Sequence, residues 1–100
     1  MLLQETEARL TTMIERARAG DTDGAEESFV QIEPVLREVS RLLADLPDEV
    51  ILRAELSDAV TGIEQELAGT RRAEALADIA EAAHDALVEV PEVLGLAPQN

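Results

Sequence analysis

One hundred residues and 10.8 kDa are enough for one domain with a modest hydrophobic core. Hydrophobic residues make up 46% of the chain and charged residues 30%, with one aromatic residue and no cysteine. The apolar content excludes a disordered chain, and the lack of cysteine excludes a disulfide scaffold, a cysteine-ligated zinc module and cysteine catalysis. No apolar run approaches the roughly 18 to 20 residues of a membrane span, and no basic-plus-apolar signal peptide leads the chain, so we expect a cytoplasmic protein.

The charge is strongly negative. Twenty-two acidic residues face eight basic ones, all arginine, for a net charge of −14. Such a field repels phosphate groups, so we expect no nucleic-acid partner and no anionic membrane surface, and it favours a basic protein as partner. Abundant carboxylates without lysine are typical of proteins from salt-loving microbes, although a GC-rich genome also favours arginine over lysine. The simplest interpretation is that the acids form a solvated coat.

The first apolar stripe predicts a helix from about Leu2 to Ala19, because its spacings of seven, three and four suit an amphipathic helix. Gly20 is a natural end, since glycine takes a left-handed conformation without strain. Residues 20–24 are predicted as a loop. Asp23 is then expected as an N-cap, with Glu26 completing a capping box. The inner residues of this first helix are Leu3, Leu10, Met13, Ile14 and Ala17.

The strongest stripe predicts a second helix that ends at residue 46, where Pro47 forces its neighbour out of helical dihedrals. Pro34 lies inside this helix and removes one amide donor. Because the apolar phase continues across it, we expect a kink near residues 30–34 rather than a break that makes Pro34 the first residue of a new helix. Val35 and Leu42 widen the stripe, whose main residues are Ala25, Phe29, Ile32, Leu36, Val39, Leu43 and Leu46.

A third helix is predicted directly after Pro47, with Asp48 and Glu49 in its first turn, where carboxylates suit the helix dipole. Gly62 lies in the middle of this helix, at a cost of about 1 kcal/mol relative to alanine. That cost points to close packing of the backbone there. Gly69 ends the helix, and the inner residues are Leu52, Leu56, Ala59, Val60, Ile63 and Leu67.

A fourth helix is predicted from about Arg71 to Val90. Thr70 is expected to cap its start, and Pro91 to end it. Many alanines make this helix slim and strongly helix-favouring. Its inner residues are Leu76, Ile79, Ala80, Ala83, Leu87 and Val90.

Short connectors favour antiparallel neighbours, so the expected fold class is all-α: a four-helix antiparallel up-down-up-down bundle with the second helix kinked at Pro34. We expect one domain over residues 1–90 and a C-terminal tail over residues 91–100. The core is small for four helices, and apolar residues that flank the second stripe favour a homodimer over a monomer. Three tail residues are expected to fold back over the open end of the bundle or to fray: Val93, Leu94 and Leu96.

One spacing carries a specific chemical interpretation. Glu81-x-x-His84 on a helix places a carboxylate and an imidazole on one face, as in carboxylate-bridged di-iron bundles. A full site needs a second such pair, and the chain has one histidine, so only a symmetric oligomer could build it. Conceivable supplementary ligands are Glu33, Glu38 and Glu64. The alternative is that His84 is a half-exposed boundary residue and that its spacing from Glu81 is accidental.

Nothing else in the chain points to catalysis or to a cofactor, and we expect no enzyme. The serines at 28, 40 and 57 fall in predicted helix interiors without a neighbouring base. No glycine-rich phosphate loop occurs. The acidic run of residues 21–24 lacks the spaced ligands of a calcium loop and is expected to be a helix connector. A histidine phosphotransfer module would need small and basic neighbours beside His84, where Asp85, Ala86 and Leu87 follow.

The run Ala17-Arg18-Ala19-Gly20-Asp21 between two amphipathic helices resembles helical-hairpin chaperones such as those of flagellar export, and equally single tetratricopeptide-like repeats. The aromatic anchors of both are absent, and no residue receives a role from the resemblance.

As function we expect a non-enzymatic acidic protein-interaction module, either an adaptor, a chaperone-like protein or an assembly subunit. The alternative is a metal- or iron-binding bundle assembled at a homo-oligomer interface around Glu81 and His84. A third hypothesis is that the protein is a purely structural subunit of a larger assembly. The candidate anchors for a partner are Val35, Leu42, Val93, Leu94 and Leu96.

Overall fold

The computed structural model describes residues 3–95, and these residues form four α-helices without a strand. A single 3-10 turn precedes the third helix. The expected all-α class is therefore confirmed. The elements are α1 (Leu3–Arg18), α2 (Thr22–Leu43), η1 (Pro47–Glu49), α3 (Val50–Ala68) and α4 (Ala73–Val93).

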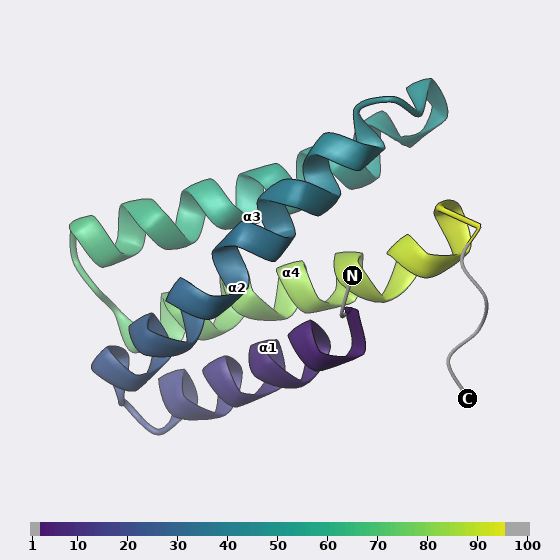
Figure 1. Ribbon diagram of the computed structural model, residues 1–100. Coiled ribbons are helices and arrows are strands. Elements are labelled where there is room, and N and C mark those ends of the chain that lie inside the picture. The colour runs from purple at the N-terminus through teal and green to yellow at the C-terminus, as the bar shows by residue number, and fades with distance from the viewer. Residues whose placement is uncertain (1–2, 96–100) are drawn as a thin grey trace.

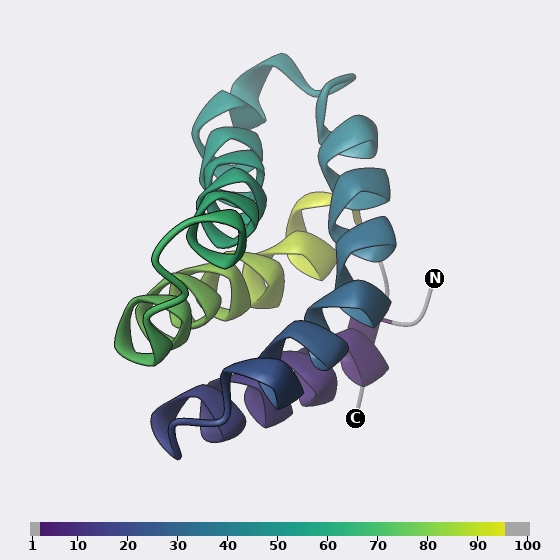
Figure 2. The same ribbon diagram turned by 90° about the vertical axis from the view of Figure 1, so that its left-hand side faces the viewer.

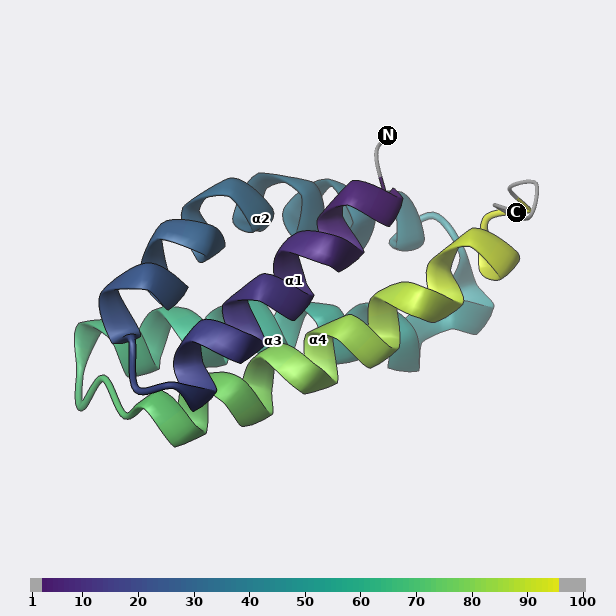
Figure 3. The same ribbon diagram turned by 90° about the horizontal axis from the view of Figure 1, so that it is seen from below.

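Each helix packs against two others. Helix α1 lies against α2 and α4, and α3 lies against the same two helices, while α2 and α4 contact each other little. Figures 1 and 2 show α1 beside α2 and α3 beside α4, and Figure 3 shows α1 and α4 side by side. One continuous core fills the space between the helices, and its largest fully buried side chains are Leu10, Met13, Ile32, Leu36, Leu43, Leu56, Ile63, Leu76 and Leu87.

The turn between α1 and α2 corrects the expected cap. Gly20 has a φ of +82°, as its place after α1 predicts. The N-cap is Asp21, not Asp23, because the Asp21 carboxylate accepts from the Gly24 N–H at 2.9 Å. A Cβ on Gly24 would lie 2.1 Å from Asp21 Oδ2, so a larger residue at that position would force the Asp21 side chain to shift. Arg16 stabilises the turn through a hydrogen bond of 3.1 Å that its guanidinium donates to the Gly24 carbonyl.

Helix α2 is continuous through Pro34, so the alternative of a new helix starting at Pro34 is wrong. Pro34 supplies no N–H to the carbonyl of Val30, which costs one helical hydrogen bond. The helix persists because Ile32 and Leu36, on either side of the proline, are both fully buried. Burial of two large side chains outweighs one lost hydrogen bond.

The connection from α2 to α3 differs from the expectation. Helix α2 ends at Leu43, three residues before the predicted end. Leu46 is extended, with φ −113° and ψ 96°, as expected for a residue before a proline. Asp48 and Glu49 lie in η1 rather than in the first turn of α3.

The start of α4 shows a second cap that differs from the prediction. Gly69 ends α3 as expected, but the N-cap of α4 is Arg72 and not Thr70. The Glu66 carboxylate takes over the capping, because it accepts from the Arg72 N–H at 2.9 Å and from the Thr70 hydroxyl. These two donors lower the pKa of Glu66, the backbone N–H being the larger cause.

Pro91 does not end α4, which continues to Val93. The last turn is held by the Leu94 N–H, which donates to the Val90 carbonyl at 2.9 Å. Val93 and Leu94 are partly buried against the core, and this packing keeps the turn helical beyond the proline. Leu96 lies outside the described residues.

Candidate functional site

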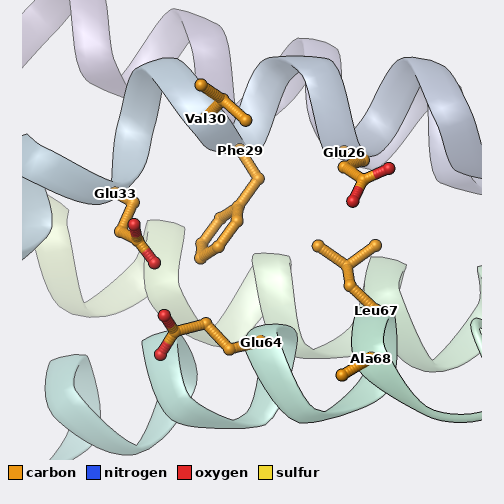
Figure 4. Close-up of a pocket in the computed structure, with 7 residues that line it drawn as sticks. All are labelled: Glu26, Phe29, Val30, Glu33, Glu64, Leu67 and Ala68. Carbon is orange, nitrogen blue, oxygen red and sulfur yellow. The ribbon is translucent and has the colours of Figure 1, made fainter.

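An open groove of about 350 Å³ lies between α2 and α3. Most of its lining lies between the two helices, while the Val30 side chain points away from α3 (Figure 4). We call this hollow the α2–α3 groove. It is lined by Glu26, Phe29, Val30 and Glu33 of α2 and by Glu64, Leu67 and Ala68 of α3.

The floor of the groove is apolar. The Phe29 ring is only 4% exposed and extends from α2 toward α3, where Leu67 is partly buried against the core (Figure 4). Val30 follows at the outer edge of α2 and is 67% exposed. The apolar surface that the fold leaves most exposed here is therefore Val30, at the edge of the groove.

The rim carries carboxylates. Those of Glu33 and Glu64 point toward each other across the groove (Figure 4). Arg37, one turn after Glu33 on α2, donates to both, at 2.7 Å from Glu64 and 3.4 Å from Glu33. One guanidinium, itself more than half exposed, thus serves two facing carboxylates.

The pKa values of the two carboxyl groups are shifted in opposite directions. The neighbouring Glu64 carboxylate, followed by partial burial, raises the pKa of Glu33. The hydrogen bond from Glu33, followed by that from Arg37, lowers the pKa of Glu64. Because like charges this close disfavour simultaneous ionisation, the first proton taken up by the pair settles on Glu33.

The other end of the groove is also acidic. Glu26 and Asp23 both accept from Arg71, at 3.2 and 3.0 Å, and Arg71 also donates to the Leu67 carbonyl at 3.1 Å. Counting both ends, four carboxylates meet two guanidinium groups along this face. The groove therefore keeps a local excess of negative charge beside an apolar floor.

The predicted metal pair lies elsewhere. Glu81 on α4 forms an ion pair with Arg18 of α1. His84 has its Nδ1 3.6 Å from Asp85 Oδ1, and its side chain is 30% exposed. Across residues 3–95, no three His, Asp or Glu side chains come together as a metal site would require. Glu33 and Glu64 do come together, but with Arg37 rather than with Glu81 and His84.

The predicted partner anchors within the described residues are all partly buried. Val35, Val93 and Leu94 are partly buried against the core, and Leu42 is half-buried on α2. None of them lines the α2–α3 groove. Phe29 belongs to the core, as its place in the apolar stripe predicts, and the stripe alone does not indicate the groove. The sequence feature that could have indicated the groove is Val30. It is an aliphatic residue outside the apolar stripe, with Glu26 and Glu33 one helical turn away on either side.

No protein-family model, curated protein or solved structure matches this chain. No helix in the described part of the chain combines the length and apolar character that crossing a membrane requires. The α2–α3 groove contains no cysteine, serine or histidine to act as nucleophile or base. What it offers chemically is apolar contact next to acceptors for a cation.

Proposed function

We propose that this protein is a non-enzymatic helical module that binds a protein partner, and that the α2–α3 groove is its contact surface. The observation that carries the proposal is the juxtaposition of an apolar lining, whose Val30 is 67% exposed at the edge of the groove, and a rim of three glutamates. Protein–protein recognition uses this combination of a small apolar centre and a polar rim.

The net charge supports a basic partner. At −14, the chain attracts cationic surfaces over about a Debye length of 8 to 10 Å and repels phosphate and other acidic proteins. Electrostatic attraction of this kind raises association rates and selects among partners. A partner with a positive face is therefore the one that this surface favours.

The proposal includes the arrangement of the scaffold. We propose that the bundle runs up-down-up-down and that α2 bends at Pro34, next to Glu33 of the groove. Short connectors between the helices and the packing of each helix on its sequence neighbours support the first part. The missing amide donor of Pro34 supports the second.

The test uses two matched valines. A photo-reactive phenylalanine analogue replaces either Val30, at the groove, or Val88, on α4, which is 52% exposed and outside the groove. After irradiation in the cells that make the protein, the proposal predicts a discrete cross-linked protein at position 30 that is absent at position 88. Adducts of equal yield at both positions, or at position 88 alone, would refute it.

A second comparison separates specific cross-links from nonspecific ones. The Val30 probe is repeated with Ala68→Glu, which places a further charge on the floor of the groove. The adduct should be lost, while circular dichroism should stay unchanged, because Ala68 is exposed at the end of α3. An adduct that persists would show that the groove is not the contact surface.

A further inference from the structure

The apolar and acidic parts of the groove are one helical turn apart on both of its walls. On α2, Phe29 precedes Glu33 by four residues, and on α3, Glu64 precedes Leu67 by three. Residues three or four apart lie on one helix face at about 5–6 Å. Both walls therefore present an apolar subsite and a carboxylate subsite about one helical turn apart along the groove.

The carboxylate subsite is open to another cation from the solvent side. Glu33 and Glu64 both bind Arg37, whose side chain is 57% exposed, and the Glu64 side chain is itself 41% exposed. A second guanidinium or ammonium group would relieve the repulsion between the two carboxylates. The pKa of Glu33 is raised by its hydrogen bond to Glu64, then by partial burial and by repulsion from the Glu64 carboxylate.

We infer that the occupant of the α2–α3 groove is an amphipathic helix of a basic partner protein, with an aliphatic side chain between Phe29 and Leu67 and an arginine or lysine one turn away on Glu33 and Glu64. This inference rests on the proposed function and adds the chemical pattern that the groove selects. A helix presents side chains one turn apart at about the offset that both walls show, and an acidic-rimmed apolar groove suits its amphipathic face.

A second copy of this chain is a poorer occupant. Each copy carries a net charge of −14, and the groove adds its own excess of carboxylates, so two such faces repel each other. The large apolar residues exposed away from the groove are Val50, Ile51 and Val88, and they lie on α3 and α4.

The experiment compares two synthetic helical peptides of identical composition. Both are alanine-based with one leucine and one arginine. In the first the arginine follows the leucine by four residues, and in the second by two, which places it on another face of the helix. Amide chemical-shift titration of the full chain at fixed ionic strength measures both dissociation constants. The inference predicts tighter binding of the first peptide, by about tenfold.

Two protein variants identify the subsite. Glu33→Gln/Glu64→Gln should abolish the preference for the first peptide. The control Glu55→Gln/Glu89→Gln also removes two negative charges, from exposed positions outside the groove, and should keep the preference. Circular dichroism of both variants checks that the helices persist.

Each contrary result overturns the inference. Equal affinity for the two peptides, or no binding of either, would exclude this helical pattern. An equal loss in the control variant would show attraction by net charge alone. A doubled mass by light scattering, together with groove shifts on concentration, would assign the groove to a second copy. The cross-link at position 30 does not depend on the peptides, so it can persist in each of these cases and leave the proposed function standing.

Discussion

The carboxylates of Glu33 and Glu64 face each other across two helices and share the single guanidinium of Arg37 (Figure 4). This arrangement is costly when both carboxylates are charged, because one cation offsets two anions. It also lies directly beside the Phe29 ring. We therefore expect the same pair to govern how the α2–α3 groove responds to pH and to the cationic ligand proposed above.

Glu33→Gln should raise the thermal midpoint at pH 7. The raised pKa of Glu33 means that the folded protein disfavours its ionised form, so this contribution to stability is present at low pH and is lost as pH rises through that pKa. The gain from the substitution should shrink toward about pH 4, where the native carboxyl group is protonated. Thermal unfolding by circular dichroism measures this, and a lower midpoint at pH 7 would contradict it.

Glu64→Gln should have the opposite effect and lower the thermal midpoint at pH 7. The lowered pKa of Glu64 means that its ionised form stabilises the fold above its unfolded pKa, and this contribution is lost as pH falls through the folded pKa. The same scans should show the two variants converging below about pH 4. A Glu64→Gln midpoint equal to that of Glu33→Gln at pH 7 would show that the pair does not divide its charge in this way.

Arg71→Gly should be more stable than Arg71→Ala. The backbone at Arg71 has a φ of +52°, the left-handed region that glycine adopts without strain. Both substitutions remove the ion pairs to Asp23 and Glu26 equally, so the difference reports the backbone alone. We expect a thermal midpoint about 5 °C higher for the glycine variant. An alanine variant that is at least as stable would show that the backbone at this position is not strained.

Gly62→Ala should stabilise the protein. A Cβ at this position would lie 3.4 Å from Ile79 Cδ1, an ordinary contact with the end of a flexible side chain. The close approach of α3 and α4 that the glycine predicts is present, yet it leaves room for one methyl group. Urea unfolding should show a gain of about 0.5–1 kcal/mol from helix propensity. A decrease in the free energy of unfolding would mean that the Ile79 side chain cannot move to make room for the added methyl group.

Salt should raise the thermal midpoint between low ionic strength and molar KCl. Twenty-two carboxylates against eight arginines repel one another in the folded protein, and salt screens this repulsion. The ion pairs between side chains are exposed, and their loss in salt costs less than the repulsion that salt relieves. A midpoint that falls steadily with added KCl would reverse this balance.

The helices were predictable because their apolar stripes repeat along the sequence. Residues such as Leu10, Leu36, Leu56 and Leu87 are fully buried, as their spacing indicates. Repeats of this kind depend only on local geometry, so the number of helices and their inner faces follow from the chain itself.

The caps and the groove depend on contacts between distant residues, which periodicity does not contain. Asp23 and Glu26 suggest a capping box in the sequence, but both carboxylates bind Arg71, more than 40 residues later. Asp21 is then left to cap α2. Likewise, whether Glu33 meets Glu64 depends on how α2 and α3 are rotated about their axes, which no local pattern fixes.

The most direct measurement uses the single aromatic residue of the chain. Since the protein has one phenylalanine and no tyrosine or tryptophan, the ring signals of Phe29 can be followed by NMR without overlap. His84 on α4 is an internal control outside the groove. Adding the leucine–arginine peptide with the four-residue spacing should shift the Phe29 ring and leave the His84 ring in place. A shifted His84 beside an unchanged Phe29 would contradict the assignment of the α2–α3 groove as the binding surface.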